Sequence, residues 1–257
     1  MRLLPIAVLL FAPMTTMAAT RCEHRAPRHL QLDLAGVRGV QIEVNSHTLH
    51  LRGGSTNGLT LDGQACASDE ASLAALQVTH RREGDQLILD MAGDSSASVN
   101  RFGSSYRNLE ATAQLPFNLP VRLDVGSGDA DAQDLRQLRG GVGSGDLRVS
   151  RIAGVFDASV NSGDIDATDI GSLNLGSVGS GDVKATVIKG DVRVGSIGSG
   201  DVTLGQIGGS VKADTLGSGD LNVSDVAGDF TLGAKGSGDV DHRNIKGRID
   251  VPHSDDD

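Results

Sequence analysis

The phrase Gly126-Ser127-Gly128-Asp129 decides the interpretation of this 257-residue chain, because the phrase returns at nearly fixed intervals. Six further copies follow, at residues 143–146, 161–164, 179–182, 198–201, 217–220 and 236–239, and only Asn161 departs from the pattern. The successive spacings are 17, 18, 18, 19, 19 and 19 residues. A repeat of this length indicates stacked structural units, each of which buries its apolar side against the next unit.

Each repeat contains two short segments in which apolar and polar residues alternate, as they do in half-buried β-strands. The most constant apolar position follows the aspartate by six residues and is occupied by Leu135, Ile152, Ile170, Ile188, Ile207, Val226 and Ile245. No helical period is present in the repeats. Because like residues recur in register, we predict an all-β fold, a single-chain parallel β-helix (β-solenoid) with about 18–19 residues per coil.

The aspartate that ends each phrase forms a column of carboxylates, namely Asp129, Asp146, Asp164, Asp182, Asp201, Asp220 and Asp239. In one interpretation each side chain accepts backbone N–H groups at its own corner, while the flanking glycines adopt positive φ. In the other interpretation the column binds calcium, as in Gly-rich β-roll repeats, although those repeats have a shorter period. The sequence favours the structural turn column, and it predicts no metal, no cofactor and no catalytic residue.

Residues 1–19 have the pattern of a secretory signal peptide, with Arg2, an apolar run and small residues at Ala18 and Ala19. We therefore expect a periplasmic or secreted protein, or one at the surface of a bacterium. No second apolar run of about 20 residues follows, so we expect no integral membrane segment after cleavage. The formal net charge of -10 argues against binding to nucleic acid, which requires clustered Lys and Arg.

The two cysteines, Cys22 and Cys66, are an even pair in a chain with an export signal, which predicts one disulfide. A metal site formed by Cys22 with the nearby histidines is the alternative. These histidines are His24, His29, His47 and His50. Their spacing matches no closed tetrahedral site, and Arg21, Arg25 and Arg28 oppose a cation.

The chain divides by pattern into a signal peptide (1–19), an irregular β part (20–125), the regular repeats (126–252) and a polar tail (253–257). The irregular part contains alternating segments, and we expect it to cap the solenoid, because an open end exposes strand edges. Within it, the segment from Gly93 to Tyr106 is rich in Ser, Gly and Asn and is expected to be a surface loop. Its alternative role is a binding loop that uses Arg101, Phe102, Tyr106 and Arg107.

Together, the leader, the irregular β part and the Ser-Gly-Asp phrases followed by an aliphatic residue resemble the bacterial "putative adhesin" domains of the head-GIN type. The resemblance covers roughly residues 30 to 250. It implies an exported β-solenoid of the cell envelope, and it carries over no catalytic residues.

The function expected from the sequence is non-enzymatic: an adhesin or scaffold that presents a rigid β-solenoid surface to an unknown partner on the cell surface or in the envelope. One alternative is a β-helix protein that binds or cleaves polysaccharide, for which carboxylates would have to cluster in a groove. The chain has no Trp and one Tyr, so it offers few aromatic platforms for sugars. The other alternative is a calcium-stabilised repeat module.

Overall fold

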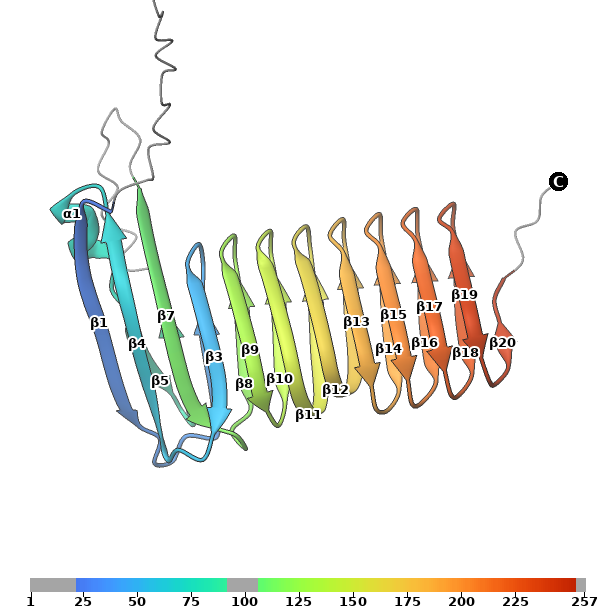
Figure 1. The fold of residues 1–257 in the computed structure, drawn as a ribbon, viewed down its shortest axis with the longest axis horizontal. Coiled ribbons are helices and arrows are strands. Elements are labelled where there is room, and N and C mark those ends of the chain that lie inside the picture. The colour runs from blue at the N-terminus through green and yellow to red at the C-terminus, as the bar shows by residue number, and fades with distance from the viewer. Residues whose placement is uncertain (1–21, 92–105, 253–257) are drawn as a thin grey trace, which may run out of the picture.

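The structure, a computed structural model, describes residues 22–91 and 106–252. These residues form an elongated rod of stacked strands, seen from the side in Figure 1. The rod is a parallel β-solenoid of about 7 turns with about 19 residues per turn, which confirms the predicted fold class. The predicted signal peptide, the expected loop up to residue 105 and the tail 253–257 lie outside the described residues.

Two β-sheet faces enclose the core, and each coil contributes one strand segment to each face. The first face contains, in spatial order, β1 (His24–Asp33), β4 (Gly58–Ala67), β7 (Arg107–Pro116), β3 (Thr48–Gly54), β9 (Asp129–Leu135), β11 (Asp146–Val160), β12 (Asp164–Val178), β13 (Val183–Ile188), β15 (Val202–Ile207), β17 (Leu221–Val226) and β19 (Val240–Ile245).

The strands of the second face follow one another along the rod in the same direction, from the N-terminal to the C-terminal end. It contains β5 (Thr79–Glu83), β6 (Gln86–Asp90), β2 (Gly39–Glu43), β8 (Val121–Val125), β10 (Leu138–Val142), β11, β12, β14 (Val192–Ile197), β16 (Val211–Leu216), β18 (Phe230–Lys235) and β20 (Ile249–Asp250). β11 and β12 run around a corner and belong to both faces.

Like residues lie side by side in this stack, as the repeat predicted. Leu147 pairs with Ile165, and Ile165 pairs in turn with Val183. The constant apolar column points inward, and its members from Leu135 to Val226 are at most 2% exposed. Phe156 and Phe230 are the largest fully buried side chains of the core. Burial of about six such side chains per coil, at roughly 25 cal/mol per Å² of apolar surface, stabilises the rod.

One coil is out of sequence order. β2 and β3 form a coil that pairs in parallel with β8 and β9. On its other side, the same coil pairs with β6 and β7. The chain therefore leaves the first coil, builds the end of the rod, and returns through β7 to add β8 beyond that coil. The segment 20–125 thus supplies the first parallel coil in addition to the strands at the end.

The N-terminal end of the rod is covered by the antiparallel strands β1, β4 and β5 and by a short helix, α1 (Glu70–Ala75). We did not predict the helix. It begins at Asp69, whose carboxylate accepts the N–H of Ser72 at 2.8 Å. At the other end of the helix, Arg28 donates hydrogen bonds to the carbonyl oxygens of Leu73 and Leu76, and β5 begins at Thr79. No helix in residues 22–91 and 106–252 is long and apolar enough to cross a membrane.

Replacement of Ile188 by Asp is expected to destabilise the rod strongly, because the side chain is 1% exposed and an aspartate there would be buried without a partner. We expect a loss of about 4 kcal/mol or more in the free energy of unfolding, measured by urea denaturation. Thr203→Asp, an exposed position on the next coil, serves as the control and should change stability little. Equal stability of the two variants would show that the Ile188 column does not face the core.

Candidate functional site

The aspartates of the Gly-Ser-Gly-Asp corners form a hydrogen-bonded ladder along the rod. The Oδ1 atom of Asp164 accepts the N–H of Asp182 at 3.0 Å, and Asp182 accepts the N–H of Asp201 at 3.2 Å. The N–H groups of Asp220 and Asp239 donate in the same way to the Oδ1 atoms of Asp201 and Asp220, at 2.9 and 3.2 Å. The four accepting carboxylates, of Asp164, Asp182, Asp201 and Asp220, therefore bind the backbone of the following coil. In the first repeats, backbone carbonyl oxygens are the acceptors instead: the N–H of Asp146 donates to Gly128 O, and the N–H of Asp164 donates to Gly145 O.

These corners differ from the expected turns in two respects. We expected each carboxylate to accept an N–H of its own corner, but the parallel stack places the N–H of the next corner within its reach. We also expected the flanking glycines to have positive φ, and none of them does. They are needed for space, because a Cβ on Gly181, Gly200 or Gly219 would overlap the backbone oxygen of the glycine one coil earlier.

The opposite corner contains a second ladder of the same kind, which we did not predict. Asp191 Oδ1 accepts the N–H of Ser210 at 2.9 Å, Ser210 Oγ accepts that of Asp229 at 3.1 Å, and Asp229 accepts that of Arg248 at 2.8 Å. The sequence signal is a Gly before each Asp or Ser and an apolar residue after it, as in Gly190-Asp191-Val192. This signal is weaker than the Gly-Ser-Gly-Asp phrase because Ser and Arg share the column with Asp.

A third column consists of residues with left-handed backbone at the end of each strand on the first face. It contains Asp134, Arg151, Asp169, Val187, Gln206, Asp225 and Asn244, with φ between 53° and 60°. Arg151 binds both carboxylate oxygens of Asp134, at 2.6 and 2.8 Å, and this hydrogen bonding lowers the pKa of Asp134. Asn and Asp tolerate this conformation well, whereas the β-branched Val187 does not.

A group of three titratable side chains is centred on His50 of β3. Its Nδ1 lies 2.8 Å from Asp131 Oδ2, and its Nε2 lies 3.6 Å from Glu110 Oε1. Asp131 belongs to β9 and Glu110 to β7, the two strands that flank β3. Because a carboxylate faces each ring nitrogen, neither nitrogen is left to activate a nucleophile. The arrangement joins three strands and lacks the geometry of a catalytic dyad.

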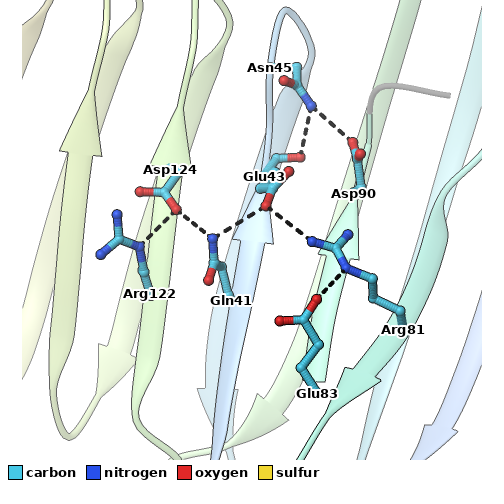
Figure 2. A network of polar contacts seen from close by, with 8 residues as sticks. All are labelled: Gln41, Glu43, Asn45, Arg81, Glu83, Asp90, Arg122 and Asp124. Atoms are coloured by element: carbon cyan, nitrogen blue, oxygen red, sulfur yellow. Dashed lines mark hydrogen bonds and ion pairs between the residues drawn. The ribbon is translucent and has the colours of Figure 1, made fainter. Parts of the chain in front are cut away.

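A second polar network lies on the outer surface of the second face (Figure 2). Gln41 of β2 donates to Asp124 of β8 at 3.0 Å, and Arg122 donates to the same Asp124 oxygen at 2.9 Å. Toward the cap, Arg81 of β5 lies 4.0 Å from Glu43 and 2.9 Å from Glu83. Asn45, in the corner after β2, donates to Asp90 of β6 at 3.0 Å. The network connects four neighbouring strands, and its carboxylates accept hydrogen bonds from amide and guanidinium groups.

The cysteines and histidines of the N-terminal part have separate partners. Cys22 and Cys66 form the predicted disulfide, with a Cα–Cα distance of 5.5 Å, and connect the start of the described chain to β4. His29 Nδ1 lies 2.6 Å from Asp62, and His47 Nδ1 accepts the N–H of Leu109 at 3.3 Å. Burial lowers the pKa of His47. The structure therefore does not bring the side chains of the alternative metal site together.

Of the four residues assigned to the alternative binding loop, the structure describes two. Tyr106 and Arg107, at the start of β7, are both exposed. Arg101 and Phe102 lie outside the described residues.

The first face carries shallow hollows on its outer surface. A hollow of about 370 Å³ lies over β3, β9, β11 and β12 and is lined by polar side chains that include His50, Arg148 and Thr168. A neighbouring hollow of about 270 Å³ includes Asp164, Asp182 and Lys184. Opposite charges alternate across these strands, since Asp131 pairs with Arg148, Arg148 with Asp166, and Asp166 with Lys184. The outer surface of the first face is therefore open and carries charges of both signs.

Comparison with known proteins found solved structures of similar fold. The chain is similar to a solved structure described as a putative adhesin from Bacteroides fragilis, with 15% sequence identity, a TM-score of 0.55, and coverage of 90% of this chain and 98% of that chain. A structure described as a putative lipid binding protein from Parabacteroides distasonis is also similar, with 15% identity, a TM-score of 0.51, and coverage of 90% and 96%. No family model and no curated protein matches the sequence. At this identity, the likeness shows the fold alone.

Replacement of Asp201 by Asn should leave stability nearly unchanged, because the amide oxygen can still accept the N–H of Asp220. Asp201→Ala removes the acceptor and should cost about 1 kcal/mol, measured by urea denaturation. Chelator should not change the melting temperature of the natural protein. A fall in melting temperature on chelation would contradict the structural role and support a calcium column.

Replacement of Val187 by Asn should stabilise the protein, because Val187 is 41% exposed and has φ of 58°. A β-branched residue in this conformation costs about 1–2 kcal/mol, and Asn relieves a large part of that strain. Thermal and urea denaturation should both show the gain. Thr203→Asn, in an ordinary strand conformation, is the matched control and should give none. A lower stability of Val187→Asn would show that the packing of the valine outweighs its strain.

Proposed function

We propose that this chain is a non-enzymatic, exported protein of the bacterial cell envelope, an adhesin or scaffold that uses its rigid β-solenoid as a contact surface. The observation that supports the proposal is that the repeated polar side chains bind the protein's own backbone. The aspartates of both corner ladders bind the backbone of the next coil, so they hold the rod together along its length. Enzymes need such groups to converge on one reacting bond.

The outer surface supports the same conclusion. Along the first face, the outward position after each corner changes from coil to coil, in the order Asp131, Arg148, Asp166, Lys184, Thr203, Asn222 and Asp241. An open surface with shallow hollows and such variety fits a large partner better than it fits a small molecule, which usually requires an enclosed pocket. The fold likeness to the structure described as a putative adhesin agrees with this role.

Within this proposal, the first face is the contact surface, because its hollows contain charges of both signs next to hydroxyl groups. Arg148 and Lys184 are the cations at its centre. The second face also carries a pair of cations, Arg193 and Lys212, which are paired across β14 and β16. These two pairs therefore provide matched variants with the same change in net charge.

The test measures binding of the purified, exported protein to envelope material of the producing bacterium, by sedimentation with isolated envelopes. We expect saturable binding that Arg148→Glu with Lys184→Glu weakens and that Arg193→Glu with Lys212→Glu leaves unchanged. No reducing or unsaturated sugar ends should appear on incubation with envelope polysaccharide. Release of such ends would support the polysaccharide-cleaving alternative, and equal binding by both variants would contradict the assignment of the first face.

A further inference from the structure

The C-terminal end of the rod differs from the N-terminal end in its exposed strand edge. β19 pairs with β17 on one side, and no strand of residues 22–91 and 106–252 pairs with its other edge. At the N-terminal end, the edge strand β1 contains Pro27, and the edge strand β5 is short and exposed, with Arg81 and Arg82. Proline prevents an edge strand from pairing with another chain, and short strands and charged side chains discourage it. β19 contains no proline, is the longest strand segment at its end of the rod, and carries two charges of opposite sign, Asp241 and Arg243, which a second strand could match.

The last coil also leaves apolar side chains incompletely covered. Val240 and Ile245 occupy inward positions, yet both are partly exposed, and Ile249 of β20 is 46% exposed. The equivalent residues of the preceding coil, Leu221 and Val226, are both 0% exposed. A further layer of strand would bury this surface in the way that each coil buries the one before it.

We propose that a second copy of this chain supplies that layer: two rods join end to end through antiparallel pairing of β19 with β19 of the second copy, around a two-fold axis at His242. Such a contact is self-complementary and closed, as two-fold interfaces are. The result is a rod of twice the length with one protected end on each side.

The backbone determines which residues can face each other. The N–H of Leu221 donates to the backbone carbonyl oxygen of Asp239, at the start of the next coil. The N–H groups of Val183 and Val202 donate in the same way to the backbone carbonyl oxygens of Asp201 and Asp220. By the same alternation, the N–H and C=O groups of Val240 and His242 point to the free edge of β19, and those of Asp241 and Arg243 point to β17. An axis centred on Asp241 or on Arg243 would place two like charges directly opposite each other, which destabilises an antiparallel pair, and is therefore excluded. An axis between two residues is excluded as well, since it would set inward side chains beside outward ones.

The charges then select His242 over Val240 as the centre. With the axis at Val240, Asp239 would face Asp241 of the second copy, and two like charges would oppose each other on each side of the axis. With the axis at His242, Asp241 faces Arg243 of the second copy, and the pair occurs twice. Opposite charges directly across an antiparallel pair stabilise it, and like charges destabilise it. Asn244 cannot serve as a centre, because its φ of 53° ends the strand.

The mass of the full exported chain in solution is the first measurement, made by sedimentation equilibrium over a wide range of concentration. We expect a reversible dimer. Asp241→Arg and Arg243→Asp each place like charges opposite each other and should raise the dimer dissociation constant about tenfold. The double variant Asp241→Arg with Arg243→Asp restores opposite charges and should restore the dimer. Thr203→Arg and Thr186→Asp, at equivalent outward positions on earlier coils, are the controls and should have no effect.

A cross-linking experiment tests the register independently of the charges. In His242→Cys, the new thiol lies opposite its own copy at a distance that suits a disulfide. The native cysteines are already paired, so this thiol is the one introduced. Mild oxidation should give a covalent dimer with His242→Cys and none with Thr203→Cys. A protein that is monomeric at all concentrations, a charge exchange that fails to restore the dimer, or equal cross-linking of both variants would each overturn the proposal.

Discussion

The stacking of each corner directly on the corner before it is the constraint on which the rest of this structure depends. The coils are held at the spacing of hydrogen-bonded parallel strands, and this brings the backbone of one corner into contact with that of the next. At Gly200, for example, a side chain would overlap the carbonyl oxygen of Gly181. The glycines of the repeated phrase therefore allow a close approach. The aspartate that follows them then accepts an N–H across the gap, which compensates for the repulsion of about 1 kcal/mol between neighbouring carboxylates in water.

This constraint also explains how an acidic protein accommodates closely spaced carboxylates. Asp182, Asp201 and Asp220 are all exposed, and each is hydrogen-bonded to the backbone of the following coil. Elsewhere, opposite charges meet across neighbouring strands, as in the pairs Arg151–Asp134 and Lys189–Asp169. A rod built in this way distributes its polar groups along its length. For this reason we place its function on an extended face and not in a pocket.

The two ends of the rod show what happens where the stacking stops. At the N-terminal end, the chain changes from parallel to antiparallel pairing and adds a helix, so the core of the first coil is covered. At the C-terminal end, the repeats continue up to β19 and β20, and their inward side chains become exposed. The difference is local, since the coils between the two ends are nearly equivalent. An end-to-end pair of rods would remove it without any change in the coils themselves.

The sequence by itself determined the period, the inward column from Leu135 to Ile245, the parallel register and the pairing of Cys22 with Cys66. Each of these depends on patterns that recur along the chain, or on an even pair of cysteines. Only the tertiary structure decided that the coil of β2 and β3 lies between β7 and β9, because strand order is set by pairing between segments far apart in sequence. It also decided that Asp201 binds the next coil and that Ser210 belongs to a second ladder. A side chain's hydrogen-bond partner depends on which backbone lies within about 3 Å of it, and in a solenoid that backbone comes from the neighbouring turn.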